Sequence, residues 1–147
     1  MIDRKFIGYK SPSFDAEVEK GRLRLFAKAI GESDPIYSDE SAAQAAGYRS
    51  IPMPPTFLFC LEMEQPDPYR WVRDIGIPIP RALHGGQSFR YQKTACAGDV
   101  LTFDAEVVDI YDKKNGALEF VVQDVFVRDQ NAAPVAGFTR TIVIRND

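Results

Sequence analysis

The sequence is poor in the residues that hold small folds or metal ions together. Its 147 residues include two cysteines, Cys60 and Cys96, and one histidine, His84. Two isolated cysteines cannot build a disulfide framework or a four-ligand zinc site, and both are expected as small core residues in a reducing compartment. A single histidine excludes a multi-histidine metal centre. We therefore expect no metal and no cofactor.

Long apolar runs and an excess of positive charge are also missing. The amino terminus mixes charged and apolar residues within residues 1–6, so it does not resemble a secretion signal, and no run reaches the ~18 apolar residues of a membrane span. The formal net charge of -3 and the pI of about 5.2 do not favour binding to nucleic acid. The sequence predicts a cytoplasmic protein with neither nucleic-acid nor membrane partners.

Apolar periodicity in the first half predicts helices. Between residues 17 and 30 the apolar positions follow the spacing of one helix face, and Gly31 supplies a left-handed residue that ends the helix. Ser38 is expected to cap a short second helix. After a proline-rich loop, residues 57–63 are apolar on almost all sides, as in a helix enclosed by its own domain. A weaker helix is expected over residues 69–73.

The second half alternates apolar and polar residues with the period of a β-strand. Every second residue from Leu101 to Val107 is apolar, and a similar run begins with Leu118, Phe120 and Val122. Further strands are expected over residues 138–144 and 87–92, with turns at residues 113–116 and 129–131.

Strands in series form a meander whose apolar face needs a cover, and the enclosed helix at residues 57–63 is the best candidate. We therefore expect an α+β fold, an antiparallel sheet wrapped around a central helix, in a single domain over residues 1–147.

The stretch from Phe26 to Glu40 carries the most informative motif. It is FAKAIGESDPIYSDE, which resembles the segment F-A-x-x-S/T-G-D-x-N-P-x-H-x-D of the MaoC-like (3R)-hydroxyacyl dehydratases and enoyl-CoA hydratases. Residues 46–48, 54–57, 83–89 and 97–101 also resemble that family, in the same order, so the resemblance covers most of the chain. It implies a hot-dog fold and an acyl thioester substrate, carried on coenzyme A or on an acyl carrier protein.

The resemblance also exposes a departure at the catalytic positions. Glu32 stands where active members have aspartate, and Tyr37 stands where they have the catalytic histidine. An Asp–His pair supplies an acid and a base near neutral pH, whereas an ordinary tyrosine has a pKa near ~10. The pattern is similar to the non-catalytic amino-terminal half of two-domain members and to the partner subunit of heterodimeric dehydratases. This similarity implies that another chain brings the Asp and His.

Four residues are candidates for a catalytic role: Glu32, Asp34, Tyr37 and His84. Each also has a structural interpretation. Asp34 before a proline is an ordinary turn residue, Tyr37 can be a packed aromatic residue with a bonded hydroxyl, and a lone histidine at the start of a strand is commonly a hydrogen-bonded structural residue. Only geometry decides between the two interpretations.

The central helix supplies the candidates for binding the acyl group, Phe57, Leu58, Leu61 and Met63. An apolar helix is usually core, so only some of these four side chains are expected to line an acyl channel.

The leading hypothesis is an acyl-thioester-binding subunit of a (3R)-hydroxyacyl thioester dehydratase or 2-enoyl thioester hydratase, with a MaoC-like partner that carries Asp and His. An active homodimeric hydratase that uses Glu32, Tyr37 or His84 is the alternative. A hot-dog thioesterase is the third, because Glu62 and Glu64 lie on the central helix, although charged residues near a helix end are normally solvated. A dimer is expected in every case, because hot-dog domains leave an open sheet edge.

Overall fold

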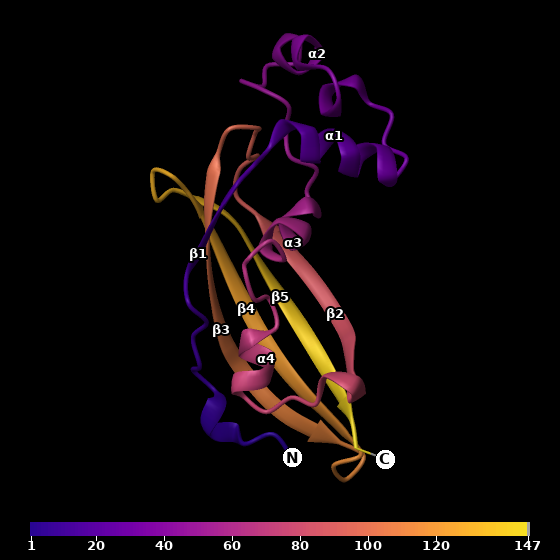
Figure 1. Ribbon diagram of the computed structural model, residues 1–147, viewed down its shortest axis with the longest axis vertical. Coiled ribbons are helices and arrows are strands. Elements are labelled where there is room, and N and C mark those ends of the chain that lie inside the picture. Colours follow the sequence, from indigo (N-terminus) through magenta and orange to yellow (C-terminus); the bar gives the residue numbers. More distant parts are fainter. Residues whose placement is uncertain (147) are drawn as a thin grey trace.

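The computed structural model describes residues 1–146. A five-stranded antiparallel sheet in the order β1-β3-β4-β5-β2 forms its main body (Figure 1). The strands are β1 (Phe14–Glu17), β2 (Ala82–Tyr91), β3 (Val100–Lys113), β4 (Leu118–Asp129) and β5 (Pro134–Arg145). The strands β3, β4 and β5 form a meander as predicted, but the strand expected over residues 87–92 begins at Ala82 and does not neighbour β3. The earlier strand β2 pairs with β5, and β1 pairs with β3.

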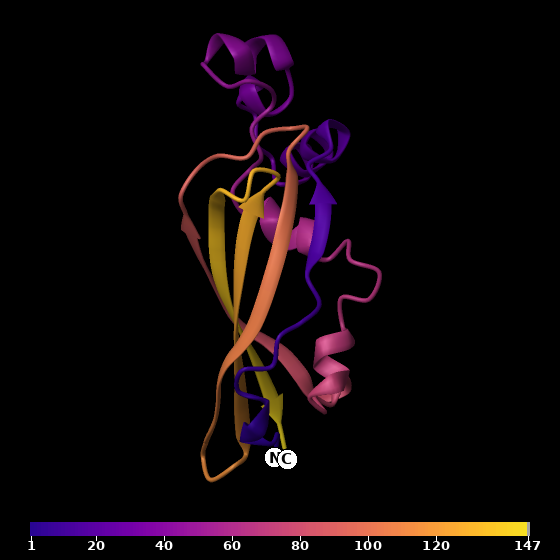
Figure 2. The same cartoon turned by 90° about the vertical axis from the view of Figure 1, so that its left-hand side faces the viewer.

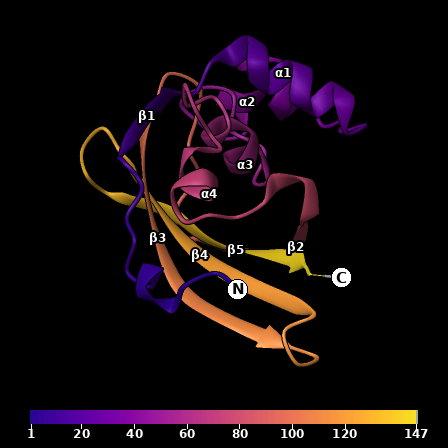
Figure 3. The ribbon, with the colours of Figure 1, turned by 60° about the horizontal axis from the view of Figure 1, so that its bottom comes forward.

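Short helices cover one face and one end of this sheet. They are α1 (Lys20–Ala29), α2 (Glu40–Ala45), α3 (Phe57–Glu62) and α4 (Arg70–Asp74), with the single 3-10 turns η1 (Arg4–Phe6), η2 (Pro35–Tyr37) and η3 (Ile79–Arg81). The helices α3 and α4 lie on the same side of the sheet (Figure 2), which curves around them (Figure 3). This is the α+β arrangement that the sequence predicts.

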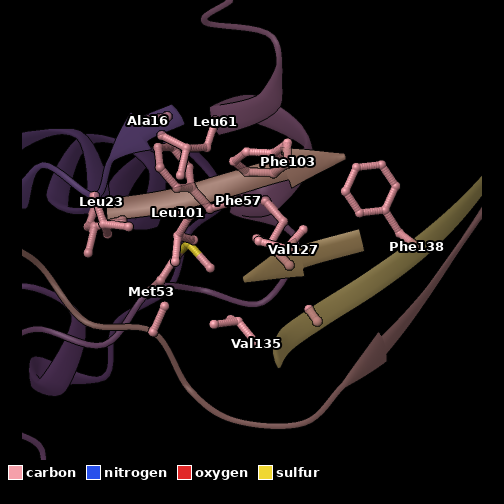
Figure 4. Packing of buried hydrophobic residues seen from close by; sticks show 14 of the residues in the cluster. Ala16, Leu23, Met53, Phe57, Leu61, Leu101, Phe103, Val127, Val135 and Phe138 are labelled. Atoms are coloured by element: carbon pink, nitrogen blue, oxygen red, sulfur yellow. The ribbon is translucent and has the colours of Figure 1, made fainter. Parts of the chain in front are cut away.

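The core lies between α3 and the concave face of the sheet (Figure 4). Phe57 and Leu61 of α3 are buried against Leu101, Phe103 and Phe138 of the strands. A second cluster lies under α4 and gathers around its buried tryptophan, the only one in the sequence. The two clusters together fix the position of α3 and α4 over the sheet.

The helix predicted over residues 17–30 begins later than expected. Residues 14–17 pair with β3 as strand β1, so α1 starts at Lys20. Gly31, with φ +74°, ends the helix as predicted. The next helix is capped by Asp39, whose carboxylate accepts the backbone N–H of Ala42 at 3.0 Å, and not by Ser38.

The alternation predicted for β3 is confirmed, because Leu101, Phe103 and Val107 are buried. For β4 the predicted face is wrong. Leu118, Phe120 and Val122 are only half-buried, whereas the fully buried row of this strand is Glu119, Val121, Gln123, Val125 and Val127. Two polar residues occupy this row, so the sequence alone wrongly indicates that the row faces solvent.

Candidate functional site

The loop after α1 brings together three of the four candidate catalytic residues. The Glu32 carboxylate accepts the backbone N–H of Asp34 at 2.9 Å. The Asp34 carboxylate in turn accepts the backbone N–H of Ile36 at 3.1 Å and caps η2, which ends at Tyr37. Both carboxylates therefore shape the loop that carries them, as the turn interpretation of Asp34 predicts.

The surroundings of Tyr37 keep its hydroxyl protonated. Burial raises the pKa of Tyr37 above its ordinary value, and the nearby Tyr48, Glu32 and Asp34 add to the rise. A base must be deprotonated at the working pH, and these surroundings oppose that state at neutral pH.

His84 lies far from this loop. It sits near the start of β2, which begins beside the carboxyl terminus at the bottom of Figure 1, whereas η2 lies beside α2 at the top. Its ring stacks on Phe59 of α3, with ring centroids 5.6 Å apart, and its Nε2 lies 3.1 Å from the amide oxygen of Gln87. The structure therefore does not bring His84 together with Glu32, Asp34 and Tyr37.

An apolar cavity of about 310 Å³ opens beside His84. It lies between α3, α4 and the strands β2 and β5, and its walls include Phe59, Met63, Trp71 and Arg140. Its volume is at the lower end of the range for small-molecule sites. A mostly apolar lining, to which Tyr69, His84 and Arg140 add polar groups, suits a ligand with a hydrocarbon portion.

The four predicted acyl-binding residues differ in position. Phe57 and Leu61 are buried in the core, and the Phe57 ring packs edge-on against Phe26 at 5.1 Å. Leu58 borders a second cavity of about 340 Å³. Met63 lines the cavity beside His84. The sequence missed Phe59, which lies on the same helix and faces this cavity; nothing in the apolar run distinguishes it from its neighbours.

A buried ion pair borders this cavity through Arg140. The Arg140 guanidinium donates to the Glu62 carboxylate at 2.8 and 3.0 Å, and the two side chains are 6% and 3% exposed. Arg140 Nε also donates to the amide oxygen of Gln123 at 2.7 Å, and the guanidinium lies 5.0 Å from the centre of the Trp71 ring. Burial raises the pKa of Glu62, while Arg140 opposes the rise.

The expectation of a solvated Glu62 is therefore wrong, because the curved sheet brings Arg140 beneath the helix end. Glu64 is half-exposed and pairs with Arg22 at 2.7 Å. Since the Glu62 carboxylate is occupied by a bidentate partner, it is poorly suited to activating water.

The described residues 1–146 contain no group of three His, Cys, Asp or Glu side chains arranged to bind a metal ion. Within the same range, no helix has the length and apolar character needed to cross a membrane.

Comparison with known proteins places this geometry in a family. The family described as "FAS1-like, dehydratase domain region" matches residues 5–138. A curated relative, a UPF0336 protein of Saccharopolyspora erythraea, is 33% identical, and the match covers 98% of this chain and 92% of the relative.

Solved structures share the fold. One is the HadBC (3R)-hydroxyacyl-ACP dehydratase complex of Mycobacterium tuberculosis, with a TM-score of 0.77, 21% identity and coverage of 93% of this chain and 96% of that chain. Another is the R-hydratase PhaJ1 of Pseudomonas aeruginosa, with a TM-score of 0.72, 19% identity and coverage of 96% and 83%. These likenesses confirm the hot-dog fold.

Proposed function

Because this chain belongs to the FAS1-like dehydratase domain family, we propose that it is the acyl-thioester-binding subunit of a (3R)-hydroxyacyl thioester dehydratase or 2-enoyl thioester hydratase. A MaoC-like partner chain supplies the catalytic Asp and His. The observation that carries this proposal is the loop around Tyr37. Its two carboxylates, on Glu32 and Asp34, bind the loop's own backbone, and the chain's single histidine lies on another element.

The chemistry of the reaction supports this division of labour. Hydration of an enoyl thioester needs one group that activates water and another that protonates carbon 2. A neutral Tyr37 whose pKa is raised by burial is a poor base at pH ~7. A histidine supplied by a partner fills that role with an ordinary pKa near ~6.5.

The cavity beside His84 is the proposed site for the acyl chain. Phe59 lines it from α3, Met63 of the predicted set lines it from the C-cap of that helix, and Trp71 lines it from α4. Phe57 and Leu61 act mainly as core residues that hold the helix in place. The thioester is carried on coenzyme A or on an acyl carrier protein.

The free edge of β2 is the proposed dimer contact. The strand runs for 10 residues and ends the sheet on one side. Its Leu83 and Tyr91 side chains are 55% and 49% exposed. A long exposed edge is normally covered, and a second hot-dog domain would cover it and complete the site.

The test is hydration of crotonyl-CoA, followed by loss of the enoyl thioester absorbance, with the native mass measured in the same sample. We expect no turnover from this chain alone and turnover after a MaoC-like chain with the Asp–His pair is added. Tyr37→Phe in this chain should leave the activity of the mixture nearly unchanged. Full turnover by the isolated chain would overturn the proposal.

A second candidate is an active homodimeric hydratase that uses His84, and the position of His84 on the cavity wall favours it. In that case the isolated chain turns over crotonyl-CoA, and His84→Ala lowers kcat by orders of magnitude with little change in the melting temperature. A His84→Ala protein with unaltered turnover excludes this role.

A further inference from the structure

Two further hollows lie under the helices on the side of β1 and β3. One is a narrow pocket of about 10 Å³, and the other is an open pocket of about 200 Å³. Trp71 lines all three spaces, and Arg140 lines the first two. Trp71 and Arg140 therefore form the wall that the His84 cavity shares with the narrow pocket, and Trp71 also borders the pocket of about 200 Å³.

We call Glu62, Arg140 and Trp71 together the partition. Side chains from four helices and strands hold it in place. Glu62 at the end of α3 binds Arg140 of β5 through two hydrogen bonds, Gln123 of β4 accepts from the same guanidinium, and Trp71 of α4 lies over it. All four residues are buried. A group held by a bidentate ion pair, an amide and a ring has little freedom to move aside for a hydrocarbon chain.

The chemistry of the partition also differs from that of the cavity walls. Each methylene group that is added to the acyl chain and enclosed by apolar walls raises the affinity of the thioester by a factor of about four. Against the partition the same group would have to displace a satisfied polar network whose members find no water as a substitute partner. Further chain growth therefore stops improving binding at this point.

We propose that the partition formed by Glu62, Arg140 and Trp71 sets the maximum length of the acyl chain that this protein accommodates. The inference rests on the proposed function, because it takes the His84 cavity to be the acyl site. A volume of about 310 Å³ holds on the order of ten methylene-sized groups if each occupies about the ~30 Å³ of a liquid water molecule. The preferred ligands are thioesters of short and medium chain length.

The test uses the fluorescence of Trp71, the single tryptophan of the chain, which lies on the cavity wall. Saturated thioesters are titrated below their micelle-forming concentrations: butyryl-, hexanoyl-, octanoyl-, dodecanoyl- and palmitoyl-CoA. For the natural sequence we expect the affinity to rise through octanoyl-CoA and then to remain level within about threefold. An affinity that keeps rising through dodecanoyl- and palmitoyl-CoA would overturn the inference but leave the proposed function standing.

The double variant Glu62→Ala/Arg140→Ala removes the two charged side chains of the partition and retains Trp71 as the fluorophore. We expect it to bind dodecanoyl-CoA at least tenfold more tightly than octanoyl-CoA, and a level series in this variant would overturn the inference. The matched control is Asp104→Ala/Arg128→Ala, which removes a half-exposed ion pair elsewhere on the sheet and should behave as the natural sequence does.

If circular dichroism shows that the alanine pair does not fold, Glu62→Leu/Arg140→Ala replaces it, with the same expectation, because it also removes both charges and shortens the side chain that lines the cavity. The titration series on the protein with the natural sequence tests the length limit without any variant. A protein whose Trp71 emission responds to no thioester of any length contradicts the proposed function itself, and the inference fails with it.

Discussion

Replacement of Glu62 by leucine should lower the free energy of unfolding by about 3–5 kcal/mol, because it leaves the Arg140 cation buried without its counter-charge. The carboxylate accepts two hydrogen bonds, at 2.8 and 3.0 Å, from a guanidinium that is 6% exposed. Gln123 and Trp71 remain beside the cation, but neither carries a negative charge. The loss is a large part of the ~5–15 kcal/mol that stabilises an ordinary domain.

The double variant Glu62→Leu/Arg140→Leu should be more stable than either single variant. Removing both charges at once leaves no uncompensated group, and apolar residues often replace buried ion pairs at little cost. Arg140→Leu alone has a further property. Burial raises the pKa of Glu62 in the folded protein, so without Arg140 its stability should be greatest at acid pH and should fall as pH rises above the ordinary glutamate value of ~4.3.

Urea unfolding measures these differences, with Trp71 fluorescence and circular dichroism recorded on the same samples. The protein concentration is held constant, because association would shift the apparent stability. In thermal melts a loss of 1 kcal/mol corresponds to about 2–4 °C for a chain of this size. If the losses of unfolding free energy in the two single variants add up to the loss in the double variant, Glu62 and Arg140 are not coupled. The description of the partition as one unit would then be wrong.

Two further predictions concern other parts of the fold. Burial and a hydrogen bond of 2.7 Å to Asp74 raise the pKa of Tyr9 to about 12; the stability this bond contributes is fully present below the ordinary value of 10.0 and is lost as pH rises through about 12. Tyr9→Phe should cost about 1 kcal/mol and remove this alkaline dependence in pH-resolved melts, and a dependence that persists would refute the assignment. Gly85→Ala should cost about 1–3 kcal/mol in urea unfolding, because its Cβ would overlap the stiff Val143 side chain. Gly86→Ala is its control, since a Cβ there meets nothing within 4 Å, and equal losses would contradict the steric argument.

The sequence predicts the elements whose signals are local. The all-round apolar character of residues 57–63 predicts α3, and the left-handed Gly31 marks the end of α1. Strand β1 has no such signal. It is 4 residues long and exists because Phe14 and its neighbours pair with Phe103 and its neighbours, far along the chain. Pairing between segments that are far apart in the sequence depends on the tertiary structure and cannot be predicted from the apolar periodicity of either segment.

In the candidate site too, the local features were predictable from the sequence and the contacts between distant residues were not. The motif placed Glu32, Asp34 and Tyr37 together, and the structure does so as well, because they lie within one loop. The cavity and its partition could not be predicted, because Glu62 and Arg140 are separated by 78 positions and meet only through the curvature of the sheet.

The partition also bears on why a charged pair lies in this core at all. A pair of leucines at Glu62 and Arg140 is expected to fold at similar stability, so the ion pair is not required to hold α3 on the sheet. Its position offers a different reason, since Arg140 lines both the cavity beside His84 and the narrow pocket toward β1, which Glu62 also lines. If the leucine pair folds as stably as the natural sequence and the alanine pair loses the limit on acyl length, stability and ligand selection are separable properties of these two residues.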